Sequence, residues 1–202
     1  SFKNEDGDVR RGIGSLGEYV EHELKSIRNS IDIPDFFRRT EQGTDVYIIG
    51  YKTEEKDWTQ KLLNSILNNF WAAIHYDELD VELAENGKVL YQISEKNLGE
   101  LMKEFAANKN DSFHYYKAVT DATVRKNKKL PQLGKVTLFI KLEEGLPKKV
   151  QMMRKSKMVV DTKAFRILPE DYSAVFICND DEGNKKLRAL EPPAHDKWDP
   201  AR

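Results

Sequence analysis

The sequence has little cysteine, no long apolar stretch and almost no net charge. Cys178 is the single cysteine among 202 residues, so no disulfide can close within the chain and a thiolate zinc site is disfavoured. This usage favours a reducing compartment, and we expect a cytoplasmic protein. No apolar run approaches the roughly 18 residues that a membrane span needs, and residues 1–8 do not resemble a signal peptide, so we expect no membrane association. Because the chain begins with Ser, we expect a piece of a longer protein.

Charge is unevenly distributed along a chain that has enough apolar residues for a core. Apolar residues make up 39% of the sequence, which excludes a wholly disordered protein. Residues 109–166 contain 15 basic and 5 acidic side chains, a net charge of +10, whereas the whole chain has a net charge of −1. Such a segment attracts phosphates, nucleic acid or an acidic partner, although solvated surface lysines give the same composition.

A basic run within this segment supplies candidate nucleic-acid contacts. These candidates are Arg125, Lys126, Lys128 and Lys129, and the aromatic residues before them are Phe113, Tyr115 and Tyr116. Lysines can follow a phosphate backbone while aromatic rings stack on bases, so DNA is one candidate partner. The alternative is a loop insertion whose aromatic residues cover the sheet.

Hydrophobic spacing predicts the elements of the first half. Residues 1–37 are expected to form a linker and a short N-terminal helix over residues 16–27. Residues 46–51 predict a buried strand, and residues 58–74 predict a long helix that Thr53 or Asp57 caps. Residues 79–83 and 89–93 alternate on either side of Asn86-Gly87, which is typical of a β-hairpin. A further helix is expected from Ser94 to Phe105.

The second half is expected to be rich in strands. Residues 107–133 are polar and predict irregular structure, whereas residues 136–142 predict a strong strand with residues 149–153 returning as its hairpin partner. Residues 172–178 predict a strand in the sheet interior, and residues 184–191 a short helix. This order predicts an α+β fold in which a mixed β-sheet carries helices on one face. We therefore expect one α+β domain over residues 38–202.

Two groups of residues resemble a known family. The first group is Gln42–Lys52, Trp58, Ile66–Ile74 and Leu79–Leu83, and the second is Phe176–Asn184, Leu187-Arg188 and Glu191–Pro200. Together they resemble the second half of prokaryotic MORC-like ATPases of the GHKL superfamily, which also contains gyrase B and MutL. The resemblance covers about residues 38–200. It implies a transducer domain with the fold of the second domain of ribosomal protein S-five.

The resemblance also implies how such a domain works. A transducer couples the ATP state of the ATP-binding domain that precedes it to dimer closure, so the implied partners are that domain of the same chain and a second copy in a homodimer. ATP and magnesium are the cofactors expected for the full-length protein. One lysine of the transducer contacts the γ-phosphate, and the candidates here are Arg154, Lys155 and Lys157. Members of the family tend to carry glycine at the position of Lys157.

The ATP site of this superfamily needs a Glu-x-x-x-Asn helix and an Asp-x-Gly-x-Gly loop. Asn68 and Asn69 imitate the helix, but the residues four positions earlier are Asn64 and Ser65, so no general base precedes either one. Residues 179–184 imitate the loop but lack its second glycine. We interpret both segments as structural and expect this chain alone to have no catalytic residue and no ATPase activity.

Two other constellations carry less weight. His195, Asp196 and Asp199 lie close in sequence, but a metal site needs further converging ligands, so packing of Trp198 as a terminal lid is favoured and no metal is expected. Asp80, Glu82 and Lys88 weakly resemble a magnesium nuclease site, although the alternation of residues 79–83 explains both carboxylates as solvent-facing. Cys178 lies in an apolar strand and is expected to be a buried, inert thiol.

Overall fold

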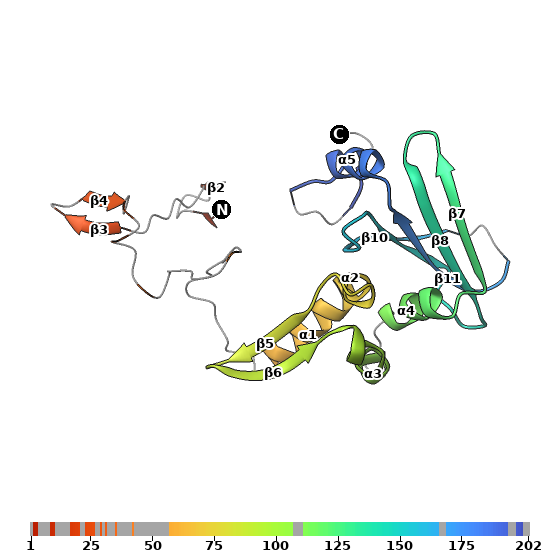
Figure 1. Ribbon diagram of the computed structural model, residues 1–202, viewed down its shortest axis with the longest axis horizontal. Helices are drawn as coiled ribbons and strands as arrows, with labels where there is room; N and C mark the ends of the chain where they lie inside the picture. The colour runs from red at the N-terminus through yellow and green to blue at the C-terminus, as the bar shows by residue number, and fades with distance from the viewer. Residues whose placement is uncertain are drawn as a thin grey trace. The chain divides into compact units, whose positions relative to one another are not determined.

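The structure is a computed structural model of the 202-residue chain. It describes residues 57–106, 111–165, 169–193 and 197–199, and before residue 57 it describes residues 2–3, 9–10, 17–20, 23–26, 29, 31, 35 and 42. The chain divides into two compact units, residues 1–51 and residues 52–202 (Figure 1). The strand predicted at residues 46–51 lies outside the described residues.

The described residues of the first unit include two short antiparallel pairs. Strand β1 (Phe2–Lys3) pairs with β2 (Val9–Arg10), and β3 (Gly17–Val20) pairs with β4 (Glu23–Ser26). The helix predicted over residues 16–27 is therefore wrong. A helix of about 12 residues is marginal without tertiary packing, and the same residues can pair across a two-residue connection, with Tyr19 opposite Leu24.

The second unit is built on a five-stranded mixed sheet. Its strands are β7 (Val124–Leu130), β8 (Gly134–Leu142), β9 (Lys149–Met153), β10 (Val159–Ala164) and β11 (Tyr172–Cys178). Their order is β10-β9-β11-β8-β7, with β9 and β11 parallel and the other neighbours antiparallel. The predicted α+β class with a mixed sheet is confirmed, and so is the interior position of β11.

The predicted hairpin between β8 and β9 is wrong, because β11 lies between these two strands. Val175 of β11 has Phe139 of β8 on one side and Gln151 of β9 on the other. Six of the seven residues of β11 are buried, which makes it the strand best suited to a central place. A strand with more half-buried positions, such as β9, can instead lie farther from the centre.

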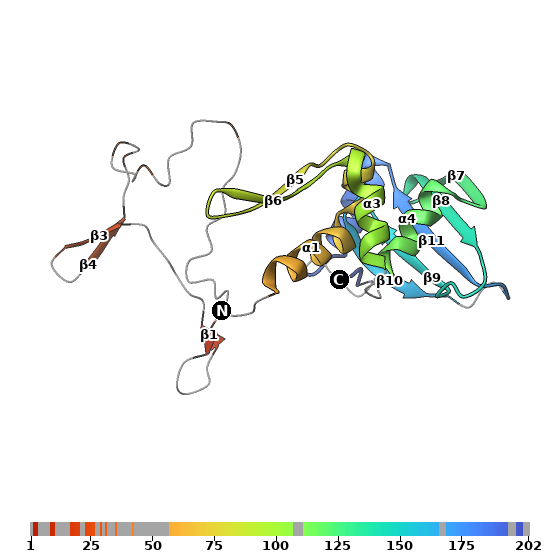
Figure 2. The ribbon, with the colours of Figure 1, turned by 90° about the horizontal axis from the view of Figure 1, so that it is seen from below.

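Helices cover one face of this sheet through a shared core. They are α1 (Trp58–Asn69), α2 (Trp71–His75), α3 (Glu95–Ala106) and α4 (Ser112–Thr120). Their apolar side chains meet Phe139, Met153, Val175 and Ile177 of the sheet in one core. Figure 2 shows α3 and α4 against the strands. The indole Nε1 of Trp71 donates a hydrogen bond of 2.8 Å to Gln151 Oε1, which ties α2 to β9.

Several predicted elements of the first half are confirmed with altered bounds. The helix predicted over residues 58–74 is interrupted at Phe70, which separates α1 from α2. The hairpin is β5 (Val81–Glu85) and β6 (Lys88–Ile93), and its turn residues Asn86 and Gly87 have φ values of 51° and 77°, as the favoured two-residue hairpin turn requires. The irregular structure predicted at residues 107–133 is wrong, because α4 and β7 lie there.

A fifth helix, α5 (Asp181–Ala189), packs against the other face of the sheet at one end. Its Leu187 contacts Val136 and Cys178, whose side chains alternate with those of the helix-covered face. The helix begins three residues before the predicted start, because Asp180 acts as its N-cap. Within the described residues, the structure has no helix that is long and apolar enough to cross a membrane.

Candidate functional site

The three candidate phosphate contacts lie in or beside one tight turn between β9 and β10. The Lys157 N–H donates to the Arg154 carbonyl over 2.8 Å, which closes a four-residue turn. Lys157 has a φ of 55°, a left-handed conformation that glycine adopts more easily. We call residues 154–157 the cation turn. Its geometry places three cations at one end of the sheet but gives each a different partner.

Arg154 is committed to a buried carboxylate. Its Nε and Nη2 lie 2.7 Å and 3.1 Å from the two oxygens of Glu191, whose side chain is 0% exposed. Trp198 Nε1 donates to the same carboxylate over 3.3 Å. A bidentate pair of this kind is strong and directional, so Arg154 joins the segment after α5 to the cation turn. Its geometry favours a structural role over a phosphate contact.

Lys157 is also largely enclosed. Its Nζ forms an ion pair with Glu78, and it lies 5.0 Å from the centre of the Tyr76 ring. Its side chain is only 12% exposed. The ring and the carboxylate hold the ammonium against the segment that follows α2.

Lys155 is the accessible member of the cation turn. Its Nζ lies 2.5 Å from Asp181 Oδ1, and the two side chains are 52% and 74% exposed. The hydrogen bond to Asp181 raises the pKa of Lys155, so the ammonium stays protonated at neutral pH. An exposed pair of this kind is weak and can exchange one anion for another. Lys155 is therefore the best of the three candidates for contact with an external phosphate.

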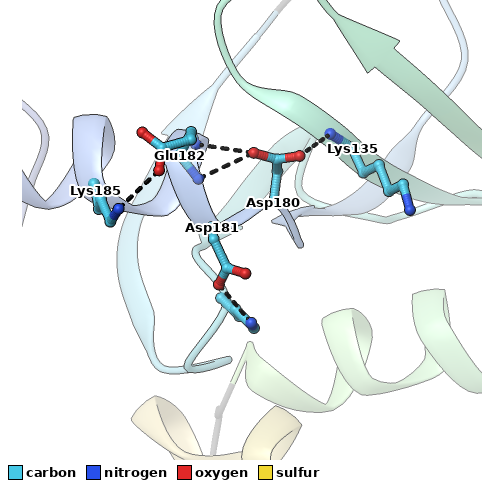
Figure 3. A network of polar contacts seen from close by, with 7 residues as sticks. Lys135, Asp180, Asp181, Glu182 and Lys185 are labelled. Atoms are coloured by element: carbon cyan, nitrogen blue, oxygen red, sulfur yellow. Dashed lines mark hydrogen bonds and ion pairs between the residues drawn. The ribbon is translucent and has the colours of Figure 1, made fainter.

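The segment that imitates a nucleotide-binding loop is the start of α5. The Asp180 carboxylate accepts hydrogen bonds from the backbone N–H groups of Glu182 and Gly183, at 3.0 Å and 3.3 Å, and from that of Lys135 at 3.4 Å. Figure 3 shows Asp180 between Lys135 and the first turn of the helix. These hydrogen bonds, that of Gly183 first, hold the pKa of Asp180 below its usual range. Its oxygens are engaged as a helix cap, which supports the structural interpretation.

The Asn-rich helix is likewise occupied with internal contacts. Asn69 Nδ2 donates a hydrogen bond of 2.9 Å to the carbonyl of Ser65, one turn earlier. Asn68 Oδ1 accepts a hydrogen bond from the Ser112 hydroxyl of α4. Both amides therefore bind groups of α1 and α4. In the part of the chain that the structure describes, no three His, Cys, Asp or Glu side chains are placed to hold a metal ion.

The basic run of the sequence is the edge strand β7. Its side chains alternate between the two faces of the sheet. On one face, Lys126 lies opposite Leu138 and Lys128 lies opposite Val136. On the other face, Lys129 lies opposite Lys135. Arg125 stacks on the Phe139 ring, with its guanidinium carbon 5.1 Å from the ring centre. We call Lys126, Lys128, Lys129 and Lys135 the lysine cluster.

The lysine cluster and the cation turn differ in their ion pairs. Among the described residues, none of its four ammonium groups has a carboxylate oxygen within 4.0 Å, in contrast to the cation turn. A hollow of about 330 Å³ lies between Lys128, Lys129, Lys135 and the polar side chains of Asn127 and Asn179. Like charges directly opposite each other in a sheet repel, so an anion bound there would relieve the repulsion.

Sequence reasoning missed Lys135 because no strand was expected at residues 124–130. A hairpin centred on residues 131–133 would have placed Lys129 beside Lys135. The aromatic residues expected to stack on bases are instead in the core. Tyr115 is 2% exposed, and Tyr116 packs edge-on against Trp71 with ring centres 6.0 Å apart. These aromatic residues do pack over the sheet, but they lie in helix α4 and the basic run is strand β7, so the loop insertion of the alternative interpretation is wrong.

The remaining candidates do not gather into a site. Asp80, Glu82 and Lys88 are all exposed, and Glu82 pairs with Gln92 rather than with Lys88. Cys178 is 0% exposed, its thiol donates to the Leu133 carbonyl over 3.4 Å, and burial raises its pKa, as expected for an inert thiol. Trp198 packs against Phe176 with ring centres 6.4 Å apart, as a terminal lid would, whereas His195 and Asp196 lie outside the described residues.

Comparison with protein-family models, with curated proteins and with solved structures finds no match to this chain.

Proposed function

We propose that this chain is the transducer domain of a GHKL-type ATP-binding protein. In this proposal it couples the ATP state of a nucleotide-binding domain elsewhere in the protein to conformational change, in a homodimer. The observation that carries the proposal is the state of Lys155, a protonated lysine at one end of the sheet whose only ion-pair partner within 4.0 Å among the described residues is itself 74% exposed. The α+β architecture is compatible with the one that the resemblance implies.

The described residues do not fit a complete nucleotide site. The Asp180 carboxylate caps α5, and Asn68 and Asn69 are bound within the helical layer. The nucleotide and its magnesium would therefore bind to the other domain, and this chain would supply one fixed positive charge. An ammonium near the phosphoryl oxygens stabilises the negative charge that gathers there during phosphoryl transfer.

Replacement of Lys155 tests this proposal. In a protein that carries the proposed nucleotide-binding domain before Ser1, Lys155→Ala should lower ATP turnover by about tenfold or more, since one phosphate cation typically contributes that much. Lys185→Ala is the matched control. Lys185 forms a similarly exposed ion pair with Glu182, at 2.7 Å, on α5, the helix that also carries Asp181. Equal turnover in the two variants, or ATP hydrolysis by the 202-residue chain alone, would contradict the proposal.

A second candidate function is binding of nucleic acid or another polyanion by the lysine cluster. The observation that favours it is the absence, among the described residues, of a carboxylate within 4.0 Å of these four ammonium groups. The buried aromatic residues predict contacts to phosphates without base stacking, and hence little sequence preference.

Fluorescence anisotropy with a short labelled DNA duplex tests this second function. The affinity should fall steeply as salt rises, and Lys129→Glu with Lys135→Glu should flatten that dependence. Lys96→Glu with Lys103→Glu makes the same charge change on α3 and should have little effect. An affinity that does not respond to salt, or that both pairs of substitutions weaken equally, would argue against a specific site at the lysine cluster.

A further inference from the structure

The face of the sheet that α1 to α4 leave uncovered is apolar. Its residues come from the three central strands: Leu138 and Ile140 from β8, Val150 and Met152 from β9, and Ala174 and Phe176 from β11. The strand register places them in two rows, Val150–Ala174–Ile140 and Met152–Phe176–Leu138. They form the floor of a hollow of about 360 Å³. We call this surface the open face.

The open face differs from the helix-covered face in burial. On the covered face, Phe139 is 3% and Val175 is 0% exposed. On the open face, Leu138, Ile140 and Phe176 are only half-buried. Strands β9 and β11 beneath it form a parallel pair, and sheets made of parallel strands are almost always covered on both faces. Both observations indicate that another element covers the open face when the protein functions.

A helix is the element that fits this surface. Helix α5 already packs on the same face at the Val136 and Cys178 end, and Phe176 lies at the border, where its ring meets that of Trp198. A second helix beside α5 would extend the existing layer and complete an arrangement with helices on both faces of the sheet. Such a helix would place one apolar side on the two rows.

The border of the open face along β7 is positively charged. Lys126 and Lys128 lie opposite Leu138 and Val136, so their side chains stand on the same face as the apolar rows. Both side chains are exposed, and neither has a carboxylate oxygen within 4.0 Å among the described residues. At the opposite border, Lys163 is paired with Asp161 at 3.2 Å. Complementary charge on an incoming helix would therefore be negative and would lie along β7.

We propose that the open face binds an amphipathic helix of a partner protein, with its apolar side on the two rows and acidic side chains facing Lys126 and Lys128. The proposal does not depend on ATP coupling. The helix would share Lys126 and Lys128 with the lysine cluster, whereas Lys129 and Lys135 lie on the other face of the sheet. Substitutions at Lys129 and Lys135 should leave helix binding intact.

Two synthetic helical peptides of about 18 residues, or five turns, test the proposal with the full 202-residue chain. Both carry leucine on one side, and the polar side carries glutamate in one peptide and lysine in the other. Isothermal titration should show binding of the glutamate peptide, with affinity at least about tenfold above that of the lysine peptide and decreasing with salt. Leu138→Glu should weaken this binding by about tenfold or more, and Lys126→Glu with Lys128→Glu should weaken it too.

Leu62→Glu is the matched control. Leu62 is a leucine with 40% exposure on α1, and α1 packs on the opposite face of the sheet. Leu138→Gln provides an uncharged variant, and far-UV circular dichroism verifies that each variant is folded. Equal affinity for the two peptides, no binding of either, or no effect of Leu138→Glu in a folded variant would overturn the proposal. A dimer in sedimentation experiments that Leu138→Glu dissociates would also overturn it, since a second copy would then cover the face.

Discussion

At the scale of single residues, the cation turn shows how neighbouring cations come to have different roles. Arg154 meets a fully buried carboxylate, Lys157 is held by Tyr76 and Glu78, and Lys155 meets an exposed one. The sequence predicts three equivalent candidates, because burial of a partner such as Glu191, 37 residues away, is invisible in local spacing. The fold assigns a different environment to each cation.

The first prediction concerns the pair between Arg154 and Glu191. Arg154→Ala should lower the free energy of unfolding by about 3 kcal/mol, because it removes the bidentate cationic partner of a buried carboxylate. Urea denaturation measures this change. Replacing both residues by methionine should recover much of the loss, since apolar side chains can substitute for a buried pair. A loss no greater than that of Lys155→Ala, which removes an exposed pair, would contradict the prediction.

The second prediction isolates the backbone cost at Lys157. Lys157→Gly and Lys157→Ala both remove the contacts to Glu78 and Tyr76, but only glycine adopts the φ of 55° without strain. The glycine variant should therefore be more stable than the alanine variant by about 1 kcal/mol. Thermal or urea unfolding of the two variants measures the difference directly. Equal stability would show that the turn relaxes around alanine.

At the scale of elements, α5 can pack at the end of the sheet because one of its residues has no side chain. A Cβ at Gly183 would lie 2.1 Å from the carbonyl oxygen of Leu133 and 2.7 Å from Cys178 Sγ. The first of these atoms belongs to the backbone, so the clash cannot be relieved by a change of rotamer. The close approach of α5 to the β7–β8 connection therefore requires glycine at this position.

The third prediction follows from this contact. Gly183→Ala should destabilise the protein by about 3 kcal/mol, although alanine is the better helix former, because α5 must move away from Leu133. Chemical denaturation measures the loss, and reactivity of Cys178 toward a thiol reagent should rise as its cover loosens. Lys185→Ala, at an exposed position of the same helix, should change neither quantity. A stable Gly183→Ala variant with a protected thiol would disprove the close packing.

The same scale shows which elements sequence patterns reveal. The hairpin β5–β6, helix α3 and strands β8 and β11 follow from apolar periodicity and an Asn-Gly turn. Strand β7 escapes such reasoning, because its five central residues are polar on both faces and its pairing with β8 depends on backbone hydrogen bonds. The pairing of β9 with β11 depends on competition between distant strands, which local patterns do not contain.

At the scale of the whole molecule, the stability of the fold depends on pH through a few side chains whose pKa values the fold lowers. Burial holds the pKa of His75 below its ordinary value of 6.5, although the charge of Glu95 opposes this. The pKa of Asp121 is lowered by its hydrogen bond to Lys141, and the pKa of Asp171 by that from the Gly145 N–H. In each case the folded chain binds fewer protons than the unfolded chain at the same pH, so stability decreases as pH falls.

The fourth prediction is a decrease of stability in two pH windows. The free energy of unfolding should decrease first below pH 6.5, as the unfolded chain protonates His75, and decrease again below pH 3.8, as the unfolded chain protonates Asp121, Asp171 and Asp180. Each group contributes its full share of the stability above the unfolded pKa of that group. This share is lost as pH falls from the unfolded pKa to the lower pKa that the group has in the folded chain. Urea unfolding at a series of pH values measures the curve.

Two variants separate the two decreases. His75→Phe keeps an aromatic ring against Tyr116 and should remove only the first decrease. Asp180→Asn keeps a capping oxygen and should reduce only the second decrease. If His75→Phe retained the full slope between neutral pH and pH 5, the half-buried imidazole would not be the source of that slope.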